Sequence, residues 1–389
     1  MELKRKRKIC FVTGSRAEYG LLNGLMHAIK DDPELDLQVI ATNMHLSPEF
    51  GLTYHEIEAD GFHIDKKVYM LLSSDTANAT AKSVGLGFMG FADAFDDLQP
   101  DMIVVLGDRY EILSAVSTAL FYKIPVAHLH GGEITEGAYD DCIRHSITKM
   151  SHLHFTSTEA YRQRVIQLGE DPSRVFNVGA PGIENIKNIS LMSRQELEDS
   201  LGVKIQDKCF LVTYHPVTLE NETAEEQSHN LLKALDAYPD YQIIFTMPNS
   251  DTNGRIIMQA INEYVAQHRD KVIAFKSLGL RRYLSALQYM TAVLGNSSSG
   301  IIEVPSFHIP TLNIGNRQKG RIASESVINC GTSVGEIKKG IETVLTEEVV
   351  GRAKRVQNPY EGKDTTADIL HVLKTYPLEG LINKHFYNL

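Results

Sequence analysis

The chain has 389 residues, of which 43% are hydrophobic and 23% charged, and its formal net charge is −10. This length exceeds one ordinary core, so we expect two domains, and the negative charge argues against nucleic acid or a membrane surface as partner. The sequence shows no signal-peptide pattern, no long apolar run and no paired cysteine spacing, which predicts a cytoplasmic protein with reduced thiols.

Short apolar, β-branched segments alternate with helix-like stretches along the chain, which is typical of βαβ units and a parallel sheet. In the first half we expect strands at residues 8–14, 35–45, 101–108, 124–130, 152–158 and 175–182. In the second half we expect strands at residues 209–216, 241–251, 271–279, 291–300, 309–318 and 326–331. This pattern predicts an α/β protein of two doubly wound Rossmann-like domains, at residues 1–185 and 186–364.

Polar residues gather where these predicted strands end. Ligands of open parallel sheets bind outside the carboxyl ends of the strands, so these residues are the candidates for a site in a cleft between two facing domains. They include Arg16, Glu18, Asp108, Arg109, Glu111, His215, Asn249, Ser297, Ser298, Ser299 and Arg317.

The stretch "GLGFMG", Gly85 to Gly90, matches the dinucleotide-binding pattern G-x-G-x-x-G, and Asp108 follows it at the end of a predicted strand. In a dinucleotide enzyme the glycines form the turn directly after a strand. Here they follow the polar, Ala-rich "SSDTANATAKSV". We therefore interpret the stretch as a helix packed through small residues and expect no nicotinamide cofactor.

The stretch "LGNSSSGIIEV" reads as a strand end, three serines with Gly300, and the first turn of a short helix. Backbone N–H groups, hydroxyls and the helix dipole together favour a phosphate site, although a simple helix cap would need only one serine. Glu303, one turn later, is a candidate acceptor for ribose hydroxyls, and Arg317 a second cation for the phosphates.

Two further strand-end residues have a structural and a functional interpretation. Asp108 in "VLGDRYE" either caps the following helix or provides a carboxylate for catalysis. His215 in "TYHP" is either structural or an acid that donates to a phosphate oxygen. No histidine cluster has the accompanying carboxylates or thiolates of a metal site, so we expect none.

The stretch "HLHGGEITEGAYDDCIRH", residues 128–145, concentrates ionisable groups after the apolar "IPVA". We expect "GG" to let the backbone approach a ligand closely, with His130, Glu133 and Asp140 facing the reacting atoms. Arg144 and His145 fall one turn into the next helix and are interpreted as supports for those carboxylates.

Together, "GSRAEYG", "GDRYE", "HLHGGE", "DDCIRHSITKMSHLH", "PNSD", "GNSSSG" and "GNRQKGR" resemble the hydrolysing UDP-N-acetylglucosamine 2-epimerases of bacterial sialic-acid biosynthesis. The match runs in order from about Ile9 to Arg321. The resemblance implies a GT-B fold, with the C-terminal segment 365–389 packing back on the first domain, and a homodimer or a dimer of dimers.

The resemblance also implies that UDP-N-acetylglucosamine is the substrate and UDP a product. It assigns catalysis to Asp108, Asp140 and His215. It implies that the nucleotide sugar contacts Arg16, Gly20, Arg109, Asn249, Lys276, Leu278, Ser298, Ser299, Gly300, Glu303 and Arg317.

One departure from the family concerns "HLHGGE". Many relatives read H-I-E-G-G-E, and their first, catalytic glutamate corresponds to His130 here, so either His130 or Glu133 takes that role. The implied reaction eliminates UDP to give 2-acetamidoglucal, then adds water to give N-acetylmannosamine. The alternatives are a 2-epimerase of a UDP-2,4-diacetamido-trideoxyhexose, a GT-B glycosyltransferase and a nucleotide-sugar sensor.

Overall fold

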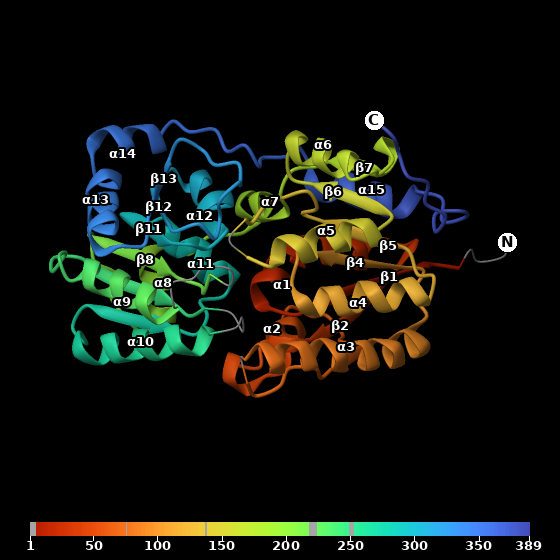
Figure 1. Ribbon diagram of the computed structural model, residues 1–389, viewed down its shortest axis with the longest axis horizontal. Coiled ribbons are helices and arrows are strands. Elements are labelled where there is room, and N and C mark those ends of the chain that lie inside the picture. Colours follow the sequence, from red (N-terminus) through yellow and green to blue (C-terminus); the bar gives the residue numbers. More distant parts are fainter. Residues whose placement is uncertain (1–4, 75, 137, 218–223, 249–252) are drawn as a thin grey trace. The chain divides into compact units, whose positions relative to one another are not determined.

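The chain forms two compact units in the computed structural model, which describes residues 5–74, 76–136, 138–217, 224–248 and 253–389 (Figure 1). Unit 1 comprises Met1–Glu133, Asp140–Asn185 and Tyr360–Leu389, and unit 2 comprises Ile134–Tyr139 and Ile186–Pro359. The short segment Ile134–Tyr139 interrupts the stretch that the sequence assigns to one domain. It groups with unit 2, where the Glu136 amide donates to the Lys319 carbonyl at 3.2 Å.

Unit 1 is built on a seven-stranded parallel sheet in the order β3-β2-β1-β4-β5-β6-β7. Its strands are β1 (Arg7–Thr13), β2 (Leu35–Thr42), β3 (Lys66–Val68), β4 (Met102–Leu106), β5 (Val126–Leu129), β6 (Leu153–Thr156) and β7 (Val175–Asn177). The six strands expected from the sequence are confirmed. The edge strand β3 was not expected.

Helices cover both faces of this sheet. On one face α1 (Arg16–Asp31) and α15 (Thr365–Thr375) bury apolar side chains, including Leu22 and Ile369, against β1 and β4. On the other face α3 (Ala77–Leu98), α4 (Tyr110–Phe121) and α5 (Asp140–Met150) lie side by side (Figure 1). The remaining helices are α2 (Tyr54–Ala59), α6 (Glu159–Gln167) and α7 (Pro181–Asn188).

The "GLGFMG" stretch lies in the interior of α3, as expected. A Cβ atom on Gly87 would lie 2.8 Å from Ser114 Oγ of α4, and one on Gly90 would lie 2.6 Å from Val68 of β3. These glycines therefore allow close helix packing, and they do not form the turn after a strand that a pyrophosphate requires.

Unit 2 is built on a six-stranded parallel sheet in the order β10-β9-β8-β11-β12-β13. Its strands are β8 (Cys209–Thr213), β9 (Gln242–Thr246), β10 (Val272–Phe275), β11 (Ala292–Gly295), β12 (Thr311–Ile314) and β13 (Val327–Cys330). All six were expected from the sequence.

The faces of the second sheet are covered in the same way. One face packs against α9 (Ala224–Leu235), α10 (Gly254–Gln267) and α13 (Val334–Val344). The other packs against α8 (Arg194–Leu201) and α11 (Leu280–Leu287), near α12 (Ser299–Ile302). The last helix of the unit is α14 (Glu347–Ala353). No helix among the described residues is long and apolar enough to cross a membrane.

The order of the strands determines where the candidate residues lie in each sheet. In unit 1 the chain adds β2 and β3 on one side of β1 and then continues with β4 on the other side. In unit 2 it adds β9 and β10 on one side of β8 and then continues with β11 on the other side. The strand order therefore reverses between β1 and β4 and between β8 and β11. Ligands of doubly wound sheets bind at the carboxyl ends of the strands beside this switch point. Arg16 and Asp108 follow β1 and β4, and His215 and Ser298 follow β8 and β11.

Candidate active site

The loop after β4 in unit 1 holds Asp108 beside a buried arginine. Gly107 adopts a positive φ of 78°, and its carbonyl accepts a hydrogen bond from His128 Nε2 at 2.8 Å. Burial lowers the pKa of His128 to about 3, so the imidazole is neutral and structural. This turn directs the Asp108 carboxylate toward Arg144, whose Nη2 donates to Asp108 Oδ2.

Arg144 connects the loops after β4 and β5. Its side chain is only 1% exposed, and its Nη1 donates to the Glu133 carbonyl at 3.0 Å and lies 3.4 Å from Asp141 Oδ1. Arg144 thus contacts the carboxylates of Asp108 and Asp141 and the main-chain carbonyl of Glu133, whereas the sequence expected it to support the carboxylates of Glu133 and Asp140. His145, the other predicted support, lies 3.5 Å from an Asp141 carboxylate oxygen.

The "HGGE" turn after β5 has a tightly defined backbone. His130 has a φ of 64° although it carries a side chain, and its amide donates to the Phe155 carbonyl at 3.0 Å. Gly132 has a φ of 78°, and a Cβ there would collide with the Tyr161 carbonyl. The second glycine of the motif is thus required by both backbone angle and space.

This turn brings His130 and Glu133 together. His130 Nδ1 lies 2.6 Å from Glu133 Oε1, and the Ser157 hydroxyl donates to the same oxygen at 2.9 Å. All three side chains are buried. The sequence named His130 and Glu133 as alternatives, but their contact and the role of Ser157 were not predicted. Asp140 is the first residue of α5 and is partly exposed.

The loop after β1 contains the predicted phosphate contacts of unit 1. Arg16 opens α1 after the capping residue Ser15, and its Nε lies 3.0 Å from Glu56 Oε2. Gly20 is buried within α1, and its carbonyl accepts from Asn185 Nδ2 at 2.7 Å.

Two buried glutamates, Glu18 and Glu111, lie near Arg109. The sequence analysis named both residues but did not predict that they interact. Arg109 Nε lies 2.7 Å from Glu111 Oε1, and the Gly14 amide donates to Glu18 Oε2 at 2.7 Å. Burial, together with the charge of Glu111, raises the pKa of Glu18 to about 8. The signal was present, because Glu18 and Glu111 follow neighbouring strands.

In unit 2, His215 is held by the residue that follows β11. The His215 amide donates to Asn296 Oδ1 at 2.7 Å, and Asn296 Nδ2 donates to the His215 carbonyl at 2.8 Å. The Asn296 carbonyl in turn accepts from Arg317 Nη1 at 3.2 Å and from Gln318 Nε2 at 2.9 Å. Asn296 therefore joins His215 to Arg317, a connection that the sequence did not reveal.

The serine-rich segment of unit 2 forms the short helix that the sequence predicted. Ser298 precedes α12, and Ser299 Oγ lies 2.6 Å from the Tyr283 hydroxyl. Gly300 is buried, and a Cβ there would lie 2.9 Å from Thr311. Glu303, at the end of α12, is also buried. The anion-binding role of this segment stays a prediction.

The predicted uridine contacts are described in part. Lys276 is exposed after β10, and Leu278 is buried, with its carbonyl accepting from Arg282 Nε at 2.5 Å. Asn249 lies outside the described residues.

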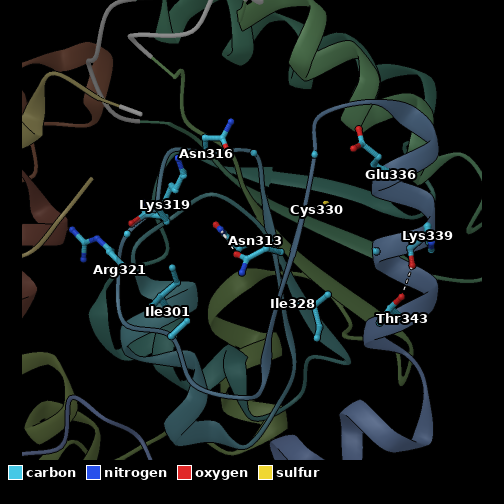
Figure 2. A pocket seen from close by; sticks show the side chains of 17 residues that line it. Ile301, Asn313, Asn316, Lys319, Arg321, Ile328, Cys330, Glu336, Lys339 and Thr343 are labelled. Atoms are coloured by element: carbon cyan, nitrogen blue, oxygen red, sulfur yellow. Dashed lines mark hydrogen bonds between the residues drawn. The ribbon is translucent and has the colours of Figure 1, made fainter. Parts of the chain in front are cut away.

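A pocket of about 650 Å³ adjoins the "GNRQKGR" segment of unit 2 (Figure 2). It lies at the carboxyl ends of β12 and β13, where Asn313 Nδ2 donates to Asn329 Oδ1 at 2.8 Å. The side chains of Lys319, Arg321 and Lys339 contribute positive charge to its lining, and Ile301 of α12 contributes apolar surface. Its size suits a small ligand.

Comparison with known proteins finds a family model and relatives that match nearly the whole chain. The family model described as UDP-N-acetylglucosamine 2-epimerase matches residues 27–374. A Campylobacter jejuni protein named GDP/UDP-N,N'-diacetylbacillosamine 2-epimerase (hydrolyzing) is 45% identical over 99% of this chain and 100% of its own length. The Escherichia coli polysialic acid biosynthesis protein P7 is 38% identical over 95% of this chain and 94% of its own.

Solved structures share the fold. The Neisseria meningitidis UDP-GlcNAc 2-epimerase bound to UDP-GlcNAc superimposes with a TM-score of 0.78 at 17% identity, over 94% of this chain and 99% of that one. The predicted fold class of two parallel-sheet α/β domains, similar to GT-B, is therefore confirmed.

Proposed function

Because the chain belongs to the UDP-N-acetylglucosamine 2-epimerase family, we propose that it hydrolyses and epimerises a UDP-2,4-diacetamido-2,4,6-trideoxyhexose. The products are UDP and the free sugar inverted at C2. This departs from the main expectation of the sequence analysis, UDP-N-acetylglucosamine, and takes up its alternative. The observation that favours the change is the 45% identity to a relative named for the diacetylbacillosamine sugar, against 38% to the polysialic acid relative.

The proposed reaction begins with elimination. The C1–O bond breaks and UDP leaves with the electron pair, while a base takes the proton from C2 and a C1=C2 double bond forms. Water then adds to C1, and a proton returns to C2 on the opposite face. The balance is one UDP-sugar and one water for one free sugar and one UDP, so the reaction requires no redox cofactor.

Departure of UDP develops negative charge that the protein must stabilise. The cations Arg16 and Arg109 in unit 1 and Arg317 in unit 2, with the hydroxyls of Ser298 and Ser299, are the groups that we assign to the diphosphate. Fixed donors of this kind stabilise a leaving group because they need no reorganisation as the charge develops. His215, fixed through its backbone by Asn296, is assigned to the same oxygens as a donor.

The proton transfers are assigned to the loops after β4 and β5. The set of Asp108, Arg144, His130 and Glu133, buried except for the partly exposed Asp108, carries this proposal, because hydrogen bonds hold acid–base groups at the carboxyl ends of two neighbouring strands. Asp140 begins the next helix and completes the set. A glycosyltransferase of the same fold would need a single base and an acceptor surface, so this concentration of acid–base groups favours elimination.

The test compares two substrates in heavy water. UDP-N,N'-diacetylbacillosamine and UDP-N-acetylglucosamine are each incubated with the protein without added cofactor, and UDP release and deuterium at C2 of the free sugar are measured. We expect release from both, with kcat/KM at least tenfold higher for the diacetamido sugar, and one deuterium at C2. A preference for UDP-N-acetylglucosamine would move the assignment to the sialic-acid type, and the absence of UDP release from either would reject it.

A further inference from the structure

The side chains of His130 and Glu133 form a buried pair whose geometry separates their roles. His130 Nδ1 lies 2.6 Å from Glu133 Oε1, and the relative exposures of the two side chains are 7% and 2%. The pair is imposed by the turn, because the positive φ values of His130 and Gly132 bend the chain back on itself within four residues. The backbone of the turn therefore holds the two side chains in contact.

The contacts of Glu133 hold it in one place. Its Oε1 accepts from the Ser157 hydroxyl at 2.9 Å, and its main-chain carbonyl accepts from Arg144 at 3.0 Å. A carboxylate only accepts hydrogen bonds, so His130 must donate through Nδ1. The proton on Nδ1 leaves Nε2 as the nitrogen with the lone pair in the neutral imidazole.

Nε2 of His130 is buried and has no hydrogen-bond partner among the residues that the structure describes. A buried polar atom without a partner is rare and calls for an explanation such as a catalytic role. His128, two residues earlier, is the structural contrast: its Nε2 contacts the Gly107 carbonyl at 2.8 Å and its Nδ1 the Thr148 hydroxyl at 3.3 Å. Both ring nitrogens of His128 therefore have hydrogen-bond partners, whereas Nε2 of His130 has none among the described residues.

We propose that Glu133 is a positioning residue that fixes the tautomer and orientation of His130, and that Nε2 of His130 takes the C2 proton in the elimination. This assignment rests on the proposed function. The C2–H electron pair becomes the C1=C2 bond, UDP leaves with the C1–O pair, and the proton moves to Nε2. Glu133 then faces the imidazolium and stabilises its charge, as the carboxylate of a Ser-His-Asp triad does.

The pair answers the question raised by the "HLHGGE" motif. A glutamate at position 130 would present its own carboxylate, whereas His130 needs a second group to set its tautomer. Glu133 supplies this group from the same turn, three residues along the chain. Asp108 is less suited to take the proton, since its carboxylate is already bound by Arg144.

A double-mutant cycle tests the division of roles. The variants are Glu133→Gln, His130→Gln and the double substitution, with Glu136→Gln as a control that removes an exposed carboxylate three residues further on. We expect each single variant to lower kcat by roughly 100-fold with KM within about threefold of wild type. Because Glu133 acts through His130, the double variant should be no more than about threefold slower than His130→Gln.

Two outcomes overturn the proposal. If the single effects multiply in the double variant, Glu133 contacts the substrate independently of His130. If Glu133→Gln turns over like wild type, the pair is structural. Retained UDP binding and an unchanged Tm show that each variant is folded.

A measurement without substrate separates this proposal from the proposed function. Nitrogen-15 NMR of labelled histidines reports which ring nitrogen of His130 carries the proton. We expect the Nδ1–H form in the wild type and a mixture of tautomers in Glu133→Gln. A mixture already in the wild type overturns the positioning role even if turnover is seen, whereas a fixed tautomer in a protein that releases no UDP rejects only the proposed function.

Discussion

Arg144 of α5 is buried and forms an ion pair with Asp108, a partly exposed residue that follows the turn after β4. Because the same guanidinium donates to the Glu133 carbonyl, one side chain sets the positions of two loops that carry candidate catalytic groups. The pair lies wholly within unit 1, so its contribution can be measured through both stability and turnover.

Replacing Arg144 by Ala should remove turnover and destabilise unit 1. The change removes the guanidinium donor from the Asp108 carboxylate and the Glu133 carbonyl. Loss of one member of a fully buried ion pair typically costs about 3–5 kcal/mol, and we expect a smaller loss here because Asp108 is partly exposed to water. We expect Arg144→Lys to recover part of the stability but little of kcat, because an ammonium group cannot reproduce the two-pronged geometry. Urea unfolding and UDP-release assays on both variants measure this. Wild-type turnover in Arg144→Ala would contradict the linking role.

Gly132 and Gly131 offer a matched comparison in the "HGGE" turn. Gly132→Ala places a Cβ against the Tyr161 carbonyl at a φ of 78°, so we expect at least a tenfold loss of kcat and a loss of stability of about 1–3 kcal/mol. Gly131→Ala meets its nearest atoms, His128 Nδ1 and Thr148 Oγ1, at 3.2 Å and should cost less. Equal effects in the two variants would show that backbone angle is not decisive.

Tyr283→Phe tests the serine segment of unit 2. The phenol hydroxyl fixes Ser299 at 2.6 Å, and its removal frees that hydroxyl to rotate. A net hydrogen bond contributes about 0.5–1.5 kcal/mol, so the dissociation constant of UDP should rise roughly threefold to tenfold. Isothermal titration calorimetry measures it. The control is Tyr289→Phe, which removes a contact of the same kind to the Met192 carbonyl and should bind UDP normally.

Glu18 makes a specific prediction for pH dependence. Burial and the charge of Glu111 raise its pKa from 4.5 to about 8, so between these values the folded state binds a proton that the unfolded state has lost. The free energy of unfolding therefore falls as the pH rises through this range, by up to about 1.4 kcal/mol per pH unit from this group. Glu18→Gln keeps the neutral shape and should remove this slope.

Urea unfolding of wild type and Glu18→Gln at pH 5, 7 and 9 measures the effect. The stability difference between them should grow in favour of the variant as the pH rises. Glu34→Gln, which removes an exposed carboxylate, serves as the reference. A constant difference across the three pH values would mean that Glu18 is ionised in the folded protein throughout.

The sequence predicted the strands well because both sheets are parallel and covered on both faces. Such strands are continuous apolar runs, as in "MIVVL" of β4 and "CFLVT" of β8, and these are hard to mistake. The strand β3 was not predicted because it has only three residues, Lys66, Lys67 and Val68, and two of them are charged. An edge strand of this kind forms through its neighbour β2 and has no apolar pattern of its own.

For the candidate site, the sequence predicted the loops on which the residues lie but not the contacts between their side chains. Strand-end reasoning found Asp108, His130 and Glu133, because the carboxyl ends of parallel strands meet at one edge of a sheet. The pairs Asp108–Arg144, Glu18–Glu111 and His215–Asn296 depend on side-chain directions and on turns with positive φ. Side-chain directions and turn angles are set by packing between segments far apart in the chain, and local sequence patterns do not predict such packing.

The return of the C-terminal segment to unit 1 has a consequence for how the protein is made. Ile369 and Leu373 of α15 complete the core against α1, and Arg7 at the start of β1 donates to the Leu373 carbonyl at 2.5 Å. The ribosome synthesises β1 before the main part of unit 2, residues 186–359, and α15 only after it. Unit 2 can therefore reach its native state first, and the unit that is begun first is the last to be finished.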